Sequence, residues 1–514
     1  MTKDQKDPLF VLIKSLTKSE KRQFKLYVGR LGVNADSKFL NLFNVLDKSK
    51  KYDEKLILSS TDINKRQLAN VKAHLYKQVL ISLKLNPAHQ NIRSQIREQL
   101  DFASILYHKG LYNQGLKILD KAKETAINNE EKNLAYEIVE LEKVIESQYI
   151  TRSISNRADQ LAVQAKELSA ANVLTSKLSN LSLQLYGVLL KTGYVKDEAE
   201  GKHIEEYFNA RLPKYDIAEL GFREKLWLYK AYLWYGFLMQ DFLSCYKYAR
   251  KWVDLFYEQP NMIQLNPVFF LKGNNYLLES LFFLRQKEKF DKRLEKLEKT
   301  LAEKNFPDNE NVATLSFLYI NLNKVNSFFI DGSFADGLYL IPQIEKELKS
   351  YKTKIDEHHQ MVFYYKFASM HFGAGNNLDT IFYLDKIIKN KSLTMREDLL
   401  CFSRILSVIA HYEAGKDEHL ETDLRETYKF LIKMNDLHEV QKELIRFIRD
   451  LGDVYPQDLK YAFKDLLEKL KIFENHPYER RSFLYLDIIS WLESKISNTT
   501  VGQVIRDKYL DQKK

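Results

Sequence analysis

Two short segments hold residue types that could bind a metal ion. Residues 356–359 read Asp-Glu-His-His, but adjacent helical residues diverge by about 100°, so the two histidines cannot share one helix face. Residues 331–342 begin like a calcium loop, yet Asp336 and Pro342 stand where such a loop needs glycine and glutamate. We therefore expect no metal ligands, and we interpret the segments as an exposed helix end and a helix corner.

Catalytic and nucleotide-binding motifs are also missing from the sequence. Gly373-Ala-Gly375 lacks the third glycine and the preceding strand of a dinucleotide site. There is no Gly-x-x-x-x-Gly-Lys-Ser/Thr loop and no Gly-x-Ser-x-Gly elbow. The two cysteines, Cys245 and Cys401, stand in apolar helical contexts, which predicts buried thiols. We expect a non-enzymatic protein without catalytic residues or a cofactor.

Positive charge is concentrated at one end of the chain. Residues 1–100 hold 20 Lys or Arg and 9 Asp or Glu, a net charge of +11, whereas the other 414 residues sum to −1. Basic side chains at helical spacing can contact phosphates from one face. The candidate electrostatic binding residues are Lys18, Lys21, Arg22 and Lys25, supported by Lys65, Arg66, Lys72 and Lys77.

Three interpretations of this basic end stay open. It could bind nucleic acid, meet an acidic protein, or serve as a solvated surface. The segment from Val28 to Leu40, with Gly32 at its turn, resembles a helix-turn-helix, but Lys38 and Asn41 stand where the second helix should be apolar. The sequence alone does not choose among the three.

The elements that would carry these residues are helices. Glycine (17) and proline (9) are scarce, and no stretch shows sustained apolar–polar alternation, so we expect an all-α fold. Asp7-Pro8 predicts a helix start, and Thr17-Lys-Ser-Glu20 is a capping box. A longer helix is expected over residues 62–85, ended by Asn86-Pro87.

One pattern recurs along the rest of the chain. Gly110-x-Tyr112-x-x-Gly115 predicts a helix end at the first glycine, an aromatic that packs back across a hairpin, and a second glycine where two helices approach closely. Gly332, Phe334 and Gly337 repeat the pattern closely. Looser copies begin at Asp241, Gly375 and Gly415.

This pattern resembles the tetratricopeptide repeat (TPR), in degenerate form, because most tryptophan and proline positions of that repeat are missing and the spacing is not a clean 34 residues. The resemblance implies a TPR-like right-handed superhelix of antiparallel helical hairpins, preceded by a small basic N-terminal helical domain. It also implies a concave face that binds a protein or peptide partner. Expected domains are residues 1–90 (basic helices), 91–492 (α-solenoid) and 493–514 (a polar tail that frays).

The leading functional hypothesis is thus an adaptor or scaffold. The alternative is a nucleic-acid-binding regulator that uses the basic N-terminal helices, with the solenoid as sensor or oligomerisation region. No signal sequence precedes the first helix, and no apolar run is long enough to span a bilayer. We therefore expect a cytoplasmic protein without membrane insertion.

Overall fold

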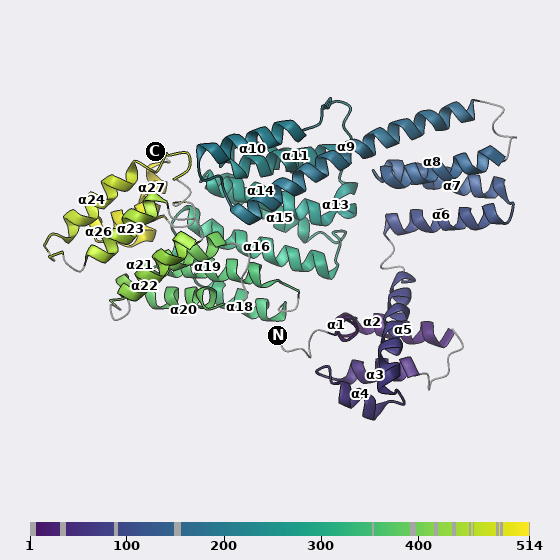
Figure 1. Cartoon of the computed structure of the whole chain (residues 1–514), viewed down its shortest axis with the longest axis horizontal. Coiled ribbons are helices and arrows are strands. Elements are labelled where there is room, and N and C mark those ends of the chain that lie inside the picture. The colour runs from purple at the N-terminus through teal and green to yellow at the C-terminus, as the bar shows by residue number, and fades with distance from the viewer. Residues whose placement is uncertain are drawn as a thin grey trace. The chain divides into compact units, whose positions relative to one another are not determined.

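The computed structural model is helical throughout the part of the chain that it describes, without a β-strand there (Figure 1). The described residues are 7–30, 38–86, 91–148, 156–351, 354–390, 397–415, 420–433, 438–451, 454–455, 457–479, 483 and 487–512. The expectation of an all-α fold is confirmed for these residues. The chain divides into two units, residues 1–161 (unit 1) and 162–514 (unit 2).

Unit 1 begins with five helices around a hydrophobic core of their own, which extends from Leu9 to Val79. The predicted domain border at residue 90 stays a prediction; α6 to α8, which follow it, belong to unit 1. The helices of unit 1 are α1 (Pro8–Ser15), α2 (Lys18–Arg30), α3 (Lys38–Lys48), α4 (Glu54–Ser60), α5 (Lys65–Lys84), α6 (Ile92–His108), α7 (Tyr112–Asn128), α8 (Lys132–Gln148) and the start of α9 (Arg157–Thr192).

The local start signals act as predicted. The Asp7 side chain accepts a hydrogen bond from the Phe10 backbone N–H at 2.9 Å, and Pro8 is the first residue of α1. Thr17 and Glu20 form the capping box, with reciprocal hydrogen bonds of 2.6 and 3.2 Å. The helix expected over 62–85 begins at Lys65. The predicted turn at Gly32 and the stop at Pro87 lie outside the described residues.

The corner between α6 and α7 has the predicted geometry. Gly110 has a φ of 72°, in the left-handed region that favours glycine. The Leu111 N–H donates to the Leu106 carbonyl at 2.9 Å, which closes the helix end. The rings of Tyr107 and Tyr112 lie 5.9 Å apart across the corner, as expected for an aromatic that packs back on the first helix.

Unit 2 consists of further helices joined by short corners around one continuous core. Its helices after α9 are α10 (Glu198–Arg211), α11 (Phe222–Leu238), α12 (Phe242–Glu258), α13 (Asn261–Leu265), α14 (Pro267–Phe283), α15 (Lys287–Leu301), α16 (Glu310–Ile330), α17 (Phe334–Gly337), α18 (Leu340–Ser350), α19 (Glu357–Gly373), α20 (Asn377–Ile388), α21 (Glu397–Glu413), α22 (Leu420–Lys433), α23 (Glu439–Asp450), α24 (Leu459–Lys471), α26 (Ile488–Ser497) and α27 (Val501–Asp511).

Five hairpin corners in unit 2 share one backbone conformation. Each has a single residue with positive φ just after the first helix, and successive corners are 45, 47, 43 and 40 residues apart. These residues are Gln240, Arg285, Gly332, Gly375 and Gly415. At three corners, the N–H of the next residue donates to the carbonyl five positions earlier, in the first helix, at 2.8 to 3.0 Å. The corner spacing therefore differs from that of a 34-residue repeat.

Neighbouring hairpins pack against each other through both of their helices. The second helix contacts the next first helix in the pairs α12 with α14, α15 with α16, α20 with α21 and α22 with α23, and first helices also contact one another. α14 contacts α16, α16 contacts α19, α19 contacts α21, and α21 contacts α23. Figure 1 shows α14, α16 and α19 side by side. Because each hairpin leaves an apolar face that only a neighbour can cover, such contacts join the hairpins into one core. The hairpin at Gly332 departs from the pattern, because two helices, α17 and α18, take the place of its second helix.

The expectation that the chain frays after Trp491 is wrong for the described part of that segment. Residues 501–511 form α27, which packs against α19. A Cβ atom on Gly502 would lie 2.9 Å from the carbonyl oxygens of both Gly332 and Gly373, so only glycine allows this approach. The polarity of the segment concealed the contact, because it depends on backbone proximity rather than on apolar side chains.

Candidate functional site

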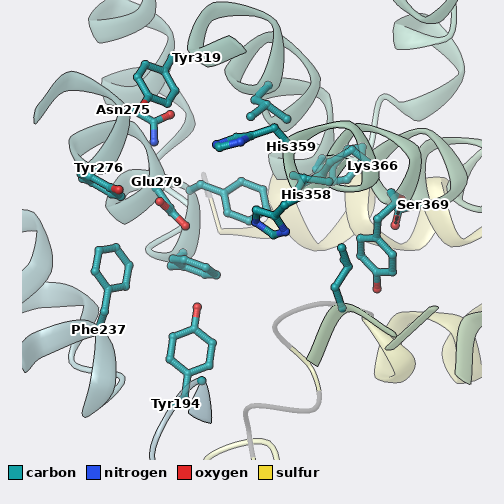
Figure 2. Close-up of a pocket in the computed structure, with 18 of the residues that line it drawn as sticks. Tyr194, Phe237, Asn275, Tyr276, Glu279, Tyr319, His358, His359, Lys366 and Ser369 are labelled. Atoms are coloured by element: carbon teal, nitrogen blue, oxygen red, sulfur yellow. Dashed lines mark hydrogen bonds between the residues drawn. The ribbon is translucent and has the colours of Figure 1, made fainter. Parts of the chain in front are cut away.

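Unit 2 contains a cavity of about 950 Å³. Figure 2 shows Tyr276 and Glu279 on one side of it and His358, Lys366 and Ser369 on the other. Its walls come from α9, α11, α14, α16 and α19, with single residues from α17, α21 and the corners. Phe483, Asp487, Val501 and Ile505 of the C-terminal region complete the lining.

The cavity lies on the side of the hairpins formed by their first helices. None of its lining residues belongs to the second helices α12, α15, α18 or α20. One hollow is therefore shared by five successive hairpins, whose first helices are α11, α14, α16, α19 and α21. A ligand in it would contact segments that are far apart in sequence but held together by the stacking of the helices.

Aromatic side chains form most of the apolar wall. Phe282 and Phe283 end α14, and Phe329 lies near the end of α16. Phe334, the aromatic of the predicted corner pattern, is 6% exposed and lines the same cavity. Burial raises the pKa of Tyr319 and of Tyr276 above the usual range, so both phenols are neutral hydrogen-bond donors in the wall.

Lys366 brings a positive charge into this aromatic wall. Its Nζ lies 4.8 Å from the ring centre of Phe282 and 5.0 Å from that of Phe329. Burial lowers the pKa of Lys366 to about 8, and the charge of Glu279 acts in the opposite direction. Near pH 7 the side chain is therefore still mainly an ammonium ion, which aromatic faces attract.

The segment at residues 356–359 lines the cavity but acts as a helix start. The Asp356 carboxylate accepts the His359 backbone N–H at 2.8 Å and contacts His359 Nδ1 at 2.7 Å. It thereby caps α19. Among the described residues, no group of three or more His, Cys, Asp or Glu side chains is placed to hold a metal ion.

The segment that begins like a calcium loop, residues 331–342, forms the corner between α16 and α17, as the sequence predicts. Gly332 has a φ of 71° and lies against α27. Gly337 lies against the Phe328 ring, since a Cβ atom there would be 2.8 Å from it.

In unit 1, Gly115 is buried, and a Cβ atom there would lie 3.4 Å from the Ala103 carbonyl oxygen, an ordinary contact.

The predicted basic residues of α2 do gather on one face. Lys18, Lys21, Arg22 and Lys25, together with Leu26, line a shallow hollow. Lys21 makes an ion pair with Asp47 at 2.8 Å, and Lys25 lies over the Phe43 ring at 5.9 Å. Lys18 and Arg22 are exposed, with no carboxylate of the described residues within 4.0 Å.

The supporting residues on α5 are not equivalent to one another. Lys72 forms an ion pair with Asp7 and donates to the Tyr52 hydroxyl at 3.1 Å, so it ties α5 to the start of α1. Lys65, Arg66 and Lys77 are exposed and do not line the α2 hollow. The structure thus brings together four of the eight predicted basic residues.

Sequence reasoning did not single out Lys366 or the cavity. A signal was present, because Lys366 is the only charged residue in the run from Met361 to Met370. A lone lysine inside an aromatic helix marks either a buried charge or a wall of a hollow. Whether Lys366 is simply buried or lines a cavity depends on residues from several hairpins, so no single segment of the sequence reveals it.

Comparison with known proteins gives no relative for this chain: no family model, no curated protein and no solved structure matches it. The resemblance to tetratricopeptide repeats therefore stays a prediction from the sequence pattern. No helix within the described residues has both the length and the apolar character needed to cross a bilayer.

Proposed function

We propose that this protein is a non-enzymatic adaptor whose unit 2 is a TPR-like solenoid, with the hollow on its inner face as the binding site for a protein or peptide partner. The observation that supports this function is the composition of the cavity wall: first helices of successive hairpins contribute most of it, and α12, α15, α18 and α20 contribute none. A surface shared by several stacked hairpins is what solenoid proteins use for recognition.

A cavity-filling variant tests this proposal. Ser369 lines the cavity from α19, and its hydroxyl donates only to the Tyr365 carbonyl of its own helix, at 2.9 Å. Ser369→Trp would fill the hollow, whereas Lys292→Trp adds the same ring at an exposed position on α15. Affinity purification followed by mass spectrometry should show partners that Ser369→Trp loses and Lys292→Trp keeps. Identical partner sets for both variants would contradict the proposal.

A second candidate function is nucleic-acid binding by α2. It is favoured by the hollow that four basic residues line without an acidic one. Filter binding at two salt concentrations tests it, because contacts to phosphates weaken steeply with salt. Retention that disappears when Lys18, Lys21, Arg22 and Lys25 are all changed to Ala would support this function. Absence of retention by the parent protein at low salt would remove it.

A further inference from the structure

The unit 2 cavity contains two ammonium groups without an acidic partner. Lys272 lines it from α14, and Lys366 lines it from α19. Among the described residues, no carboxylate oxygen lies within 4.0 Å of either nitrogen, and neither side chain makes a hydrogen bond. Burial lowers the pKa of both lysines, which marks both as partly removed from water.

Two of the four described acidic residues of the cavity, Asp356 and Asp487, contact other groups. Asp356 binds His359, and Asp487 accepts from Arg285 at 3.4 Å and from the Ser490 backbone N–H at 2.9 Å. Glu279 and Glu357 also take part in interactions. The charge of Glu279 raises the pKa of Lys366, but its carboxylate is more than 4.0 Å from the Lys366 nitrogen. Within ion-pair distance, the Lys366 and Lys272 nitrogens are thus left for a ligand to approach.

The surroundings of the Lys366 ammonium group suit an anion that also has an apolar part. The flanking rings of Phe282 and Phe329 hold the ammonium group by their faces and keep it from folding away into solvent. A hydrogen bond between oppositely charged groups is strong where water is excluded. The same rings offer an apolar surface immediately beside the charge, so the ligand should carry an apolar body next to its anionic group.

The boundaries of the cavity favour a small molecule. Its volume of about 950 Å³ is within the range of pockets that enclose small organic ligands, roughly 300–1,000 Å³. Phe483, Val501 and Ile505 line it from the C-terminal region. These side chains add to the apolar surface that the body of a small ligand would contact.

We propose that the unit 2 cavity binds a small amphipathic anion, with its apolar body against the aromatic wall and its carboxylate, phosphate or sulfonate group at the Lys366 nitrogen. Lys272 adds a second positive charge to the cavity lining, from α14. This site goes beyond the adaptor function and does not depend on it, because no protein partner is needed for the small molecule to bind.

Two dyes that differ in one charged group test the proposal on the full-length protein. 1-Anilinonaphthalene-8-sulfonate carries an anionic sulfonate, and N-phenyl-1-naphthylamine has the same rings without it. Each is titrated by fluorescence against the parent protein, Lys366→Gln and Lys366→Arg. The matched control is Lys289→Gln, which removes an exposed lysine from α15.

We expect one saturable site for the sulfonate dye. Loss of a charge-assisted hydrogen bond in Lys366→Gln should weaken its binding roughly ten- to a hundredfold. Lys366→Arg and Lys289→Gln should stay near the parent value. The neutral dye should bind Lys366→Gln as it binds the parent, which also shows that the variant is folded.

Several results would overturn the proposal. They are absence of saturable sulfonate binding to the parent, equal loss of both dyes in Lys366→Gln, and sulfonate affinity that the variant leaves unchanged. Ser369→Trp should abolish the site for both dyes, and retained binding there would place the dyes elsewhere and equally refute it. The adaptor function would survive each of these results, because its test measures protein partners.

Discussion

Single buried charges are the features of unit 2 that matter most at the scale of residues. Lys366 faces the cavity, whereas Lys230 on α11 is only 9% exposed and has no carboxylate of the described residues within 4.0 Å. Its nitrogen lies 3.8 Å from the ring centre of Trp227, 4.8 Å from that of Phe269 and 5.5 Å from that of Trp252. The rings offset only part of the cost of burying the charge.

Replacing this lysine should therefore stabilise the protein. Burial, helped by the charge of Lys272, lowers the pKa of Lys230 from 10.5 to about 7. Between these values the unfolded chain binds more protons than the folded one, so the free energy of unfolding rises with pH across that window. Lys230→Met should raise the free energy of unfolding near pH 6.5 by roughly 1–4 kcal/mol and flatten the rise.

Thermal unfolding between pH 6.5 and 9.5 measures this effect. Lys289→Met, at an exposed position on α15, is the control and should behave like the parent. If Lys230→Met melted below the parent at every pH, the ammonium group would be making a favourable interaction that outweighs its burial. The interpretation of Lys230 as an unsatisfied charge would then be wrong.

Small residues decide how closely helices pack. At Gly115 in unit 1, substitutions of increasing size test how much space the contact allows. A Cβ atom at Gly115 would meet the Ala103 carbonyl oxygen at 3.4 Å and the Leu106 Cβ at 3.8 Å, both ordinary contacts. Gly115→Ala should therefore gain up to ~1 kcal/mol of helix propensity. Gly115→Leu should lose roughly 1–3 kcal/mol by overpacking. Urea unfolding of both variants checks the order, and a leucine variant as stable as the parent would contradict it.

The contact of α27 is a stricter case of close approach. A methyl group at Gly502 would lie 2.9 Å from two backbone oxygens, so α27 would have to move. We expect Gly502→Ala to cost roughly 1–3 kcal/mol and to speed hydrogen exchange over residues 501–511. Gly187→Ala is the control, because nothing lies within 4 Å of a Cβ atom there. Unchanged exchange over 501–511 in Gly502→Ala would show that α27 is not held by this contact.

The elements themselves were largely predictable, whereas their packing was not. Asp7, Thr17 and Gly110 act through neighbours within a few residues, so the sequence displays their roles directly. The corners at Gln240 and Arg285 were harder to predict, because these residues have a left-handed backbone conformation that usually favours glycine. The hydrogen bonds of each corner outweigh that backbone preference, so the residue type does not indicate the corner.

The candidate site was predictable only in part for the same reason. The basic face of α2 follows from spacing within one helix, and the structure retains it. Lys72 looked equivalent by spacing, yet its ion pair with Asp7 depends on a residue 65 positions away. The unit 2 cavity combines residues from Tyr186 to Ile505, so it arises only when all of the hairpins have packed.

At the scale of the whole molecule, the two units offer different chemistry. Residues 1–100 of unit 1 carry excess positive charge, and four of their basic side chains line an open face of α2 that suits phosphate groups or an acidic surface. Unit 2 has a hollow whose aromatic walls suit a ligand with an apolar body and whose lining also holds charged side chains of both signs. The proposed division is therefore between an electrostatic contact in unit 1 and the binding of a specific partner in unit 2.

The central claim, that the inner face of unit 2 is the partner-binding surface, can be tested by photocrosslinking from single positions. A photoreactive phenylalanine analogue at Tyr276 would report on the cavity, and the same residue at Lys292 would report on the second helix α15. We expect a discrete crosslinked partner from position 276, and none from position 292, on exposure of cells to light. The same partner crosslinked from both positions, or from position 292 alone, would contradict the claim.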